Sequence, residues 1–533
     1  MLTGKSDATE LIDALSNPEL YPHHPARVEV RETHISWVFL AGDRAYKLKK
    51  PLVLPFLDYG TPQRRRRMCD EEVRLNRRLA GDIYVGVRAL ASGQQGLRLA
   101  SERDPDAVDY VVEMRRYDER STLAARLALV GPDALGGDVV ALARVLARFH
   151  AHSRKVTVDR GGALAVRRRA DENLEELLEV VASPADADRV RALGRFTHAF
   201  LAGHAVELDS RAQDGLVVEG HGDLRAEHVL LNGALRVVDC IEFDARRREL
   251  DIADELAFLV MDLTTRGAER LARLLVDAYR EAGGNPGEER LIAFYACFRA
   301  LVRAKVRLLR ADQMPPRTAE HHDEITAAQE LLALAERFAW QARLPLVVAI
   351  CGAPAAGKTT LASALSRVSG LSHLSSDVVR KRAAGLAPDE RAPASAYSEE
   401  ANLRTYAELG RLAAGEVARR EGAIVDATFR HRADRAAFIH AFAGRAPLLF
   451  VQCSTPFEVT AARARRREAE PGRVSDASQA VVVSERDSWE PLDELEHESR
   501  ITLDGDSPFE RQLAVLQAQL DSRLAAAVSG PAS

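Results

Sequence analysis

The strongest constraint on the fold is a short motif in the C-terminal part of the chain. Residues Gly352 to Thr359, GAPAAGKT, match the pattern G-x-x-x-x-G-K-[ST] and follow the apolar run VVAIC. The glycines allow backbone N–H groups to turn inward around phosphate oxygens, and the helix that follows adds the positive end of its dipole. This order of strand, loop and helix predicts a covered parallel sheet that binds a nucleotide at one edge.

The pattern around this motif predicts two domains of different class. Before residue 344 the chain has short strands near its start and then long helical patterns, interrupted by a glycine-rich passage at Leu216 to Asp244. After residue 344, apolar strands such as GAIVDATF and PLLFVQC alternate with helices. We therefore expect an α+β domain with two lobes, followed by an α/β domain with a mostly parallel sheet. The expected boundaries are 1–343 for the first domain (small lobe about 1–115, helical lobe about 116–343), 344–525 for the second, and 526–533 for a disordered tail.

Composition narrows the class of protein. The 533 residues carry a net charge of −5, divided almost evenly between the two predicted domains, which argues against a nucleic-acid partner. The five cysteines are scattered without a Cys-x-x-Cys pair, which favours a reducing compartment without a structural metal. The chain shows no signal peptide and no apolar run of roughly 18 residues, so we expect a cytoplasmic protein without a membrane partner.

Lysine is rare in this chain, with eight lysines among 74 basic residues. Arginine supplies nearly every other positive charge, so a lysine is a candidate for a role that needs a compact ammonium group. Lys47, Lys49 and Lys50 in RAYKLKKP, and Lys358 in the C-terminal motif, are the first candidates.

The C-terminal motif predicts a nucleotide site with Mg²⁺. Lys358 should reach the β and γ phosphates of ATP, and Thr359 should hold the cation. The residues predicted to bind the nucleotide here are Gly352, Ala353, Pro354, Ala355, Ala356, Gly357, Lys358, Thr359 and Thr360.

Further carboxylates and arginines are predicted around this loop. Asp426 ends the strand of GAIVDATF and is the candidate second metal ligand, and Asp377 in SSDVVRK is the candidate base for an acceptor hydroxyl. Arg380 lies one helical turn after Asp377, and Arg463 and Arg467 share a helix face before Pro471 and Gly472. We expect these three arginines to bind phosphates, the last two from a closing lid; the alternative for Arg463 and Arg467 is a solvated surface.

These C-terminal motifs resemble the small P-loop kinases, a group that includes gluconate-kinase-like, zeta-toxin-like and polynucleotide-kinase-like proteins. The resemblance rests on GAPAAGKTTLA, SSDVVRK, VDATF and an arginine-rich helix followed by SDA at Ser475 to Ala477. It implies phosphate transfer to a hydroxyl, with Asp377 as the base, and does not identify the acceptor.

A second set of motifs lies in the N-terminal part. His221-Gly-Asp223 is followed five residues later by His228 and sixteen residues later by Asp239, at the end of the strand LRVVDC. Phosphoryl transfer needs a carboxylate to orient the hydroxyl, metal ligands beside it and a lysine on the phosphates. Asp223 is the predicted base, and His228 and Asp239 are the predicted metal ligands.

The lysine for this second site is predicted on the strand RAYKLKKP. Lys47 is our choice and Lys49 is the alternative, because the two share one face of the strand. Glu72 on the next helix is preferred over Glu71 as the carboxylate that pairs with this lysine. No glycine-rich loop precedes the strand, so Val30 to Ser36 should cover the phosphates.

The N-terminal motifs resemble aminoglycoside-phosphotransferase-like kinases, whose fold is that of the eukaryotic kinases. Together with the C-terminal domain, the chain resembles a bacterial family in which such a kinase is fused to a P-loop kinase; RETHISWVFL, GHGDLRAEHVLL and VVDCIEFD carry the match. The resemblance implies that Asp251 braces the catalytic loop. His228 replaces the usual asparagine, and imidazole is a poorer Mg²⁺ ligand than an amide oxygen, so the metal here could be Mn²⁺.

The sequence as a whole indicates a bifunctional ATP-dependent phosphotransferase. Each half would transfer the γ-phosphate to a hydroxyl of a small polar acceptor such as a sugar, aminosugar, aminoglycoside or nucleoside-like compound. One alternative is a nucleotide-binding regulatory protein in which one half is a degenerate kinase that controls the other. Another is a P-loop kinase that phosphorylates nucleic-acid ends.

Overall fold

The computed structural model describes residues 6–54, 57–94, 96–343, 347–387, 390, 392–419, 422–444, 447–468 and 489–526. The chain divides into two compact units, of which the first contains Met1–Arg169 and Ala205–Glu288 and the second Ala170–His204 and Glu289–Ser533. The second unit thus includes helices that precede residue 344, and the predicted boundary at 344 stays a prediction about the sequence domains. The predicted tail after residue 526 lies outside the described residues.

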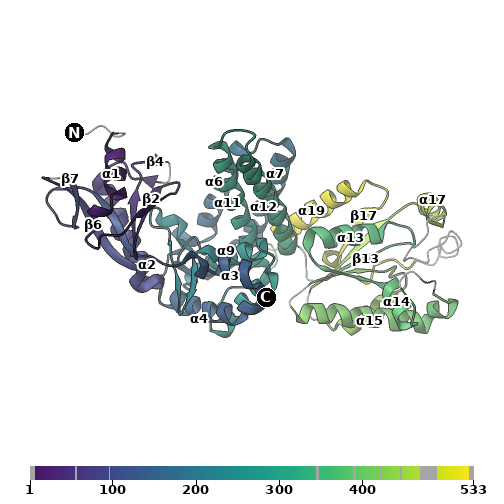
Figure 1. Cartoon of the computed structure of the whole chain (residues 1–533). Coiled ribbons are helices and arrows are strands. Elements are labelled where there is room, and N and C mark those ends of the chain that lie inside the picture. Colours follow the sequence, from purple (N-terminus) through teal and green to yellow (C-terminus); the bar gives the residue numbers. More distant parts are fainter. Residues whose placement is uncertain are drawn as a thin grey trace. The chain divides into compact units, whose positions relative to one another are not determined.

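The first unit begins with a six-stranded antiparallel sheet in the order β1-β2-β3-β8-β6-β7 (Figure 1). The strand β3 alternates, so Tyr46 and Leu48 enter the apolar cluster on one face while Lys47 and Lys49 point to the other, where α2 packs. Thr61 caps α2 by accepting a hydrogen bond from Arg64 N, and Pro62 occupies its first turn. The elements are α1 (Ser6–Ser16), β1 (Val28–Glu32), β2 (Ser36–Ala41), β3 (Arg44–Lys49), β4 (Val53–Leu54), β5 (Leu57–Asp58), α2 (Pro62–Ala80), β6 (Tyr84–Gly93), β7 (Gly96–Ser101) and β8 (Ala107–Arg115).

The rest of the first unit is mainly helical and contains two small antiparallel ladders. In one ladder β9 pairs with β12, and in the other β10 pairs with β11. These ladders position the loop that carries Asp223 and the segment that carries Asp239. The elements are α3 (Leu123–Val130), α4 (Gly136–His152), α5 (Val158–Gly161), the start of α6 (Ala163–Val180), α8 (Ala205–Gln213), β9 (Val217–Glu219), β10 (Val229–Asn232), β11 (Ala234–Val237), β12 (Glu249–Asp251), α9 (Ile252–Thr265) and α10 (Glu269–Glu281).

The second unit is built around a five-stranded parallel sheet in the order β14-β15-β13-β16-β17. Val348 and Ile350 of β13 (Val347–Cys351) enter an apolar cluster with α12, α13 and α19, and Val347, Ala349 and Cys351 enter one with α15 and α16. Helices therefore cover both faces of the sheet, which explains why VVAIC has no polar position (Figure 1). The other elements are α7 (Pro184–Gly203), α11 (Glu289–Asp312), α12 (Ala319–Arg343), α13 (Lys358–Ser369), β14 (Ser372–Ser375), α14 (Ser376–Ala383), α15 (Glu399–Ala418), β15 (Ala423–Asp426), α16 (Arg432–Phe442), β16 (Leu448–Ser454), α17 (Phe457–Glu468), β17 (Arg500–Asp504) and α19 (Phe509–Ala526).

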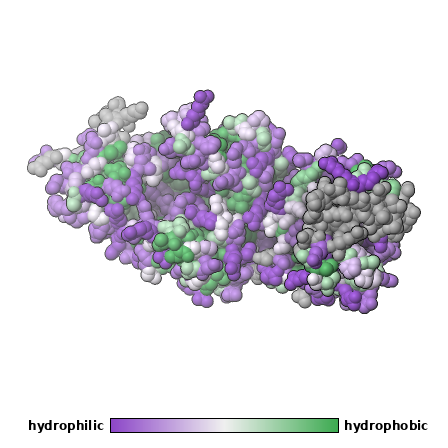
Figure 2. All heavy atoms as spheres, turned by 45° about the vertical axis from the view of Figure 1, so that its right-hand side comes forward, coloured by the Kyte–Doolittle hydropathy of each residue, from purple (hydrophilic) through white to green (hydrophobic). Residues whose placement is uncertain are grey.

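The predicted fold classes are confirmed, with an α+β region built on an antiparallel sheet and an α/β region built on a parallel one. All five cysteines are buried free thiols. The face seen in Figure 2 is mostly hydrophilic with small apolar patches. Among the described residues, no helix combines the length and the hydropathy needed to cross a membrane.

Candidate active sites

The phosphate loop follows β13 and ends at the first residue of α13. Gly352 has φ 142° and Gly357 has φ 97°, so both occupy the left-handed region that favours glycine. A Cβ on Gly352 would lie 2.6 Å from the Cys453 carbonyl oxygen, which no side chain tolerates. The buried Lys358 ammonium donates to the Ala353 carbonyl at 2.9 Å, so the loop curls around its own lysine. This geometry leaves the N-terminus of α13 as an anion-binding end.

The predicted metal-binding residues of this half lie at the same edge of the sheet. Asp426 is buried at the end of β15 and is the neighbour of Ile350 in β13. Thr359 and Thr360 are exposed on the first turn of α13. A hydroxyl and a carboxylate fit a hard cation that the phosphates of a nucleotide also ligate. His373, which the sequence analysis missed, has its Nε2 3.7 Å from Asp426 Oδ2, and no motif marked it.

Arg380 contacts the predicted base Asp377, which their spacing of three residues on α14 allows. Arg380 Nη1 donates to Asp377 Oδ1 at 3.1 Å, and Nη2 donates to Asn402 Oδ1 at 3.1 Å. The Arg380 guanidinium also stacks on Tyr397, with its central carbon 4.5 Å from the ring centroid. Asn402 and Tyr397 were missed because they come from α15 and the turn before it.

The lid predicted for this half is described only in part. Arg463 Nη1 donates to the Gly505 carbonyl at 2.9 Å and lies 3.9 Å from the position that a Cβ on Gly357 would occupy. Arg463 is therefore beside the phosphate loop. The Arg467 side chain, Pro471, Gly472 and the SDA motif at Ser475 to Ala477 lie outside the described residues.

In the N-terminal site, Lys47 brings two carboxylates together. Its Nζ lies 2.9 Å from Glu72 Oε1 and 2.8 Å from Asp239 Oδ1. Lys47 also holds the pKa of Asp239 well below its usual range, although burial opposes this. Burial raises the pKa of Glu72, but Lys47 and Lys49 outweigh it and the net pKa is lowered. Glu71 takes no part in this contact and pairs with Arg248 instead.

Lys49 points to the same face as Lys47 but is enclosed. Its side chain is fully buried, and its Nζ contacts Glu72 Oε2 at 2.6 Å and Glu242 Oε1. The two lysines therefore share Glu72, one on each oxygen. Of the two, only Lys47 has a hydrogen bond to Asp239 among the described contacts. In the segment Val30 to Ser36, which was predicted to cover the phosphates, Ser36 is fully buried and His34 is exposed.

His221 holds the loop that carries Asp223 in place. The buried imidazole donates from Nε2 to the Val238 carbonyl at 2.9 Å and accepts from Asp223 N at 3.3 Å through Nδ1. Burial lowers the pKa of His221 to about 4, which fits this neutral tautomer. Gly222 has φ 86°, and Asp239 has φ 65°, which is unusual for a residue with a side chain. Strained backbone of this kind often marks functional positions.

Asp223 and His228 lie beside one another, joined by Arg225. The Arg225 guanidinium donates to both Asp223 carboxylate oxygens at 2.7 Å and lies 3.3 Å from His228 Nε2. His228 Nδ1 donates to the Asp223 carbonyl at 2.8 Å, which leaves the Nε2 lone pair facing Arg225 and Asp239. The sequence analysis missed Arg225 because arginine is the most common basic residue in this chain, so no local signal marks this one.

The fit of a metal ion to this site rests on two residues. His228 Nε2 lies 3.8 Å from Asp239 Oδ2, a separation that one cation can bridge. Among the described residues no group of three His, Cys, Asp or Glu side chains forms a metal site. A cation here would need phosphate oxygens as further ligands, as is usual for Mg²⁺ with nucleotides.

Asp251 ties together elements next to the Asp223 loop. It is buried, pairs with Arg211 through contacts of 2.7 and 2.8 Å, and caps α9 by accepting from Ala253 N. Its strand β12 pairs with β9, which leads into the loop. Gly220 follows β9 and has no room for a Cβ, because Glu255 Oε2 would lie 1.7 Å away.

Comparison with known proteins places the chain in a family. Residues 347–492 match the model of an AAA domain, which includes the phosphate loop. "Uncharacterized protein Rv2004c" of Mycobacterium tuberculosis (strain ATCC 25618 / H37Rv) is 35% identical over 378 residues, covering 70% of this chain and 72% of Rv2004c. The chain belongs to the Rv2004c family. Since 378 residues is more than residues 1–343 contain, the likeness to Rv2004c includes parts of both predicted domains, as expected for a fused chain.

Solved structures resemble parts of the chain at low sequence identity. A putative aminoglycoside phosphotransferase from Ralstonia eutropha covers 63% of the chain and 98% of its own length, at 14% identity and a TM-score of 0.36. A gluconokinase from Sinorhizobium meliloti covers 34% of the chain and 95% of its own length, at 17% identity and a TM-score of 0.26.

Proposed function

We propose that this member of the Rv2004c family is a bifunctional ATP-dependent phosphotransferase. Each half would transfer the γ-phosphate of ATP to a hydroxyl of a small polar acceptor, such as a sugar, aminosugar, aminoglycoside or nucleoside-like compound. The observation that carries the proposal is the contact of Lys47 with both Glu72 and Asp239, which would form a second phosphate-binding centre besides the Lys358 loop.

In the N-terminal half, Lys47 would bind the phosphates while Glu72 holds its ammonium in place. Asp223 would orient the acceptor hydroxyl and take its proton, and His228 and Asp239 would hold the cation. A bound Mg²⁺ or Mn²⁺ would neutralise charge on the phosphates. Each Asp223 oxygen that Arg225 contacts has two lone pairs, so the carboxylate could accept the hydroxyl proton with Arg225 in place.

In the C-terminal half, backbone N–H groups of Gly352 to Lys358 would enclose the phosphates, and Thr359 and Asp426 would hold Mg²⁺. Asp377 would accept the proton of the acceptor hydroxyl, with Arg380 fixing its carboxylate. Arg463, beside the loop, would bind the nucleotide from the side of α17.

A second candidate function is favoured by the contacts of Asp223. Arg225 pairs with both of its carboxylate oxygens, and an imidazole stands where a metal-binding amide is usual. In this alternative, the N-terminal half binds a nucleotide without transferring phosphate and regulates the P-loop half.

The two candidates differ in ATP turnover by the full chain. We would measure ADP release against a panel of sugars, aminoglycosides and nucleosides with Lys358→Ala, with Asp223→Asn and with both changes. The bifunctional proposal expects one group of acceptors to lose turnover with each single change. If no acceptor depends on Asp223, the regulatory alternative holds.

A further inference from the structure

A buried cluster of charges joins β3 to the segment that follows Asp239, residues 240–248. Lys49 Nζ contacts Glu72 Oε2 at 2.6 Å and Glu242 Oε1, and Tyr59 OH donates to the same Glu242 oxygen at 2.6 Å. The side chains of Lys49 and Glu72 are fully buried, and that of Glu242 is 4% exposed. Glu242 is three residues after Asp239, so this cluster ties the Asp239 segment to the small-lobe sheet.

Burying this charged cluster costs more free energy than burying an apolar contact of similar size. An ammonium and two carboxylates leave water here, and their attraction repays that cost only when the geometry is nearly ideal. Burial lowers the pKa of Lys49, but Glu242 and Glu72 outweigh it and raise the pKa well above the usual value. Lys49 is therefore charged, and the cluster fixes a geometry more than it adds stability.

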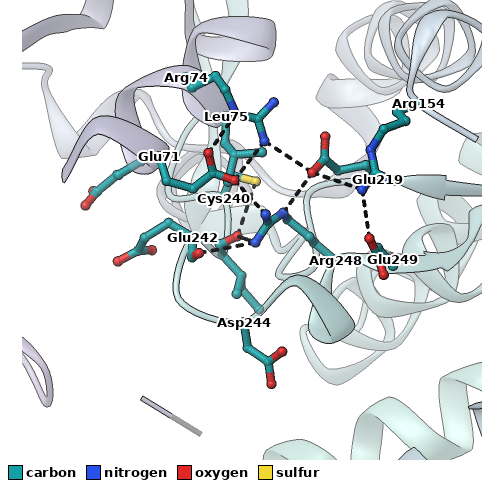
Figure 3. Close-up of polar contacts among 12 residues, drawn as sticks. Glu71, Arg74, Leu75, Arg154, Glu219, Cys240, Glu242, Asp244, Arg248 and Glu249 are labelled. Carbon is teal, nitrogen blue, oxygen red and sulfur yellow. Dashed lines mark hydrogen bonds and ion pairs between the residues drawn. The ribbon is translucent and has the colours of Figure 1, made fainter. Parts of the chain in front are cut away.

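A second contact holds the same segment from the other side (Figure 3). Arg248 Nη2 lies 2.6 Å from Glu71 Oε1 of α2, its Nε lies 3.3 Å from Glu219 Oε1, and its Nη1 donates to the Glu242 carbonyl at 3.2 Å. Arg74 and Arg154 also contact Glu219. Burial raises the pKa of Glu219, but Arg74, Arg248 and Arg78 outweigh it and lower the pKa to about 2. On α2, Glu72 is thus connected to Glu242 through Lys49, and the adjacent Glu71 contacts Arg248 directly.

The geometry points to a role for Lys49 and Glu242 as positioning residues of the N-terminal site. They hold the segment after Asp239 against β3 and α2, so that Asp239, Lys47 and Glu72 have their final arrangement before any substrate binds. Because Lys47 and Lys49 each take one oxygen of Glu72, its carboxylate cannot rotate without breaking one of these contacts. This inference rests on the proposed nucleotide-binding function of the N-terminal half.

The test uses the full chain with Lys358→Ala, so that the N-terminal half is the nucleotide site under study. In this background we would compare Lys49→Met, Glu242→Gln and the double variant. Lys50→Met is the matched control, because Lys50 directly follows β3 but pairs with Glu32, which is 66% exposed. ATP affinity is measured by calorimetry with Mg²⁺ and with EDTA, and hydrogen exchange is followed over residues 240–248.

Lys49→Met should lower the melting temperature, because it leaves the buried Glu242 carboxylate without its cation. Glu242→Gln should lower it less, because Lys49 keeps Glu72, and the double variant should recover most of the loss caused by Lys49→Met. The double variant should nevertheless bind ATP with Mg²⁺ roughly ten- to hundredfold more weakly, as is typical when a residue that supports a metal ligand is removed. Its affinity in EDTA should change much less, since the misplaced group is the Asp239 carboxylate. Hydrogen exchange of residues 240–248 should be faster, while Lys50→Met leaves all these values unchanged.

Two results would overturn the inference. One is a double variant that is stable and keeps both the Mg²⁺ enhancement and the slow exchange of residues 240–248. The other is a loss of affinity that is equal with Mg²⁺ and with EDTA, which would assign the cluster to general stability. If the Lys358→Ala chain bound no ATP at all, the proposed function of the N-terminal half would fail, and hydrogen exchange would still decide whether Lys49 and Glu242 hold the segment.

Discussion

The two candidate phosphate-binding sites are assembled in different ways. Around the phosphate loop, one contiguous segment supplies backbone N–H groups, two left-handed glycines and Lys358. In the N-terminal site, side chains from β3, α2, the Asp223 loop and the Asp239 segment must meet, and Lys47 and Asp239 are 192 residues apart. A backbone site depends on the local path of the chain, whereas a side-chain site depends on charges that several elements bring together.

The largest expected effect separates the sites by their lysines. Lys358→Ala should abolish nucleotide binding in the C-terminal half, because the ammonium is the compact charge enclosed by the loop. The N-terminal half should bind as before. Calorimetry of the full chain should show the stoichiometry fall from two nucleotides to one. A complete loss of ATP binding would contradict the presence of two sites.

The next effect concerns chemistry without binding. Asp223→Asn should leave ATP affinity at the N-terminal site nearly unchanged and reduce phosphate transfer there by about 10²- to 10⁴-fold, the usual contribution of a general base. Transfer that depends on Lys358 should stay at the wild-type rate, which provides the internal control. An unchanged rate with every acceptor would remove Asp223 from the mechanism.

A smaller effect is expected from the imidazole. His228→Asn should improve the use of Mg²⁺ relative to Mn²⁺ at the N-terminal site several-fold, because an amide oxygen is a harder ligand than imidazole nitrogen. Nucleotide affinity would be titrated against each cation in both proteins, with Lys358→Ala present to silence the other half. Identical curves would show that His228 only supports the loop through its bond to the Asp223 carbonyl.

The smallest expected effect is on nucleic acid, where we predict no tight binding by either half. The net charge of −5 offers no excess of basic residues to neutralise a phosphate backbone. Labelled single-stranded RNA and DNA would be titrated at low and moderate salt. Tight, steeply salt-dependent binding together with phosphorylation of the 5′ end would instead identify the P-loop half as a nucleic-acid end kinase.

The sequence by itself determined the class of each region and the phosphate loop. A phosphate loop is encoded locally, since glycines that permit φ of 142° and 97° and a lysine at the helix start are adjacent in the chain. The alternation of RAYKLKKP likewise placed Lys47 and Lys49 on one face of a strand.

Only the tertiary structure decided which of these side chains meet. It placed Lys47 on Asp239 and enclosed Lys49 with Glu242, although periodicity makes the two lysines equivalent. The pairing of Glu72 with a lysine was predicted from the sequence, but only the structure showed that both lysines share Glu72 and that Glu71 pairs with Arg248. The physical reason is that the packing of distant elements decides which charged side chains pair. In a chain where arginine is by far the most common basic residue, no local pattern marks which of these charges will meet.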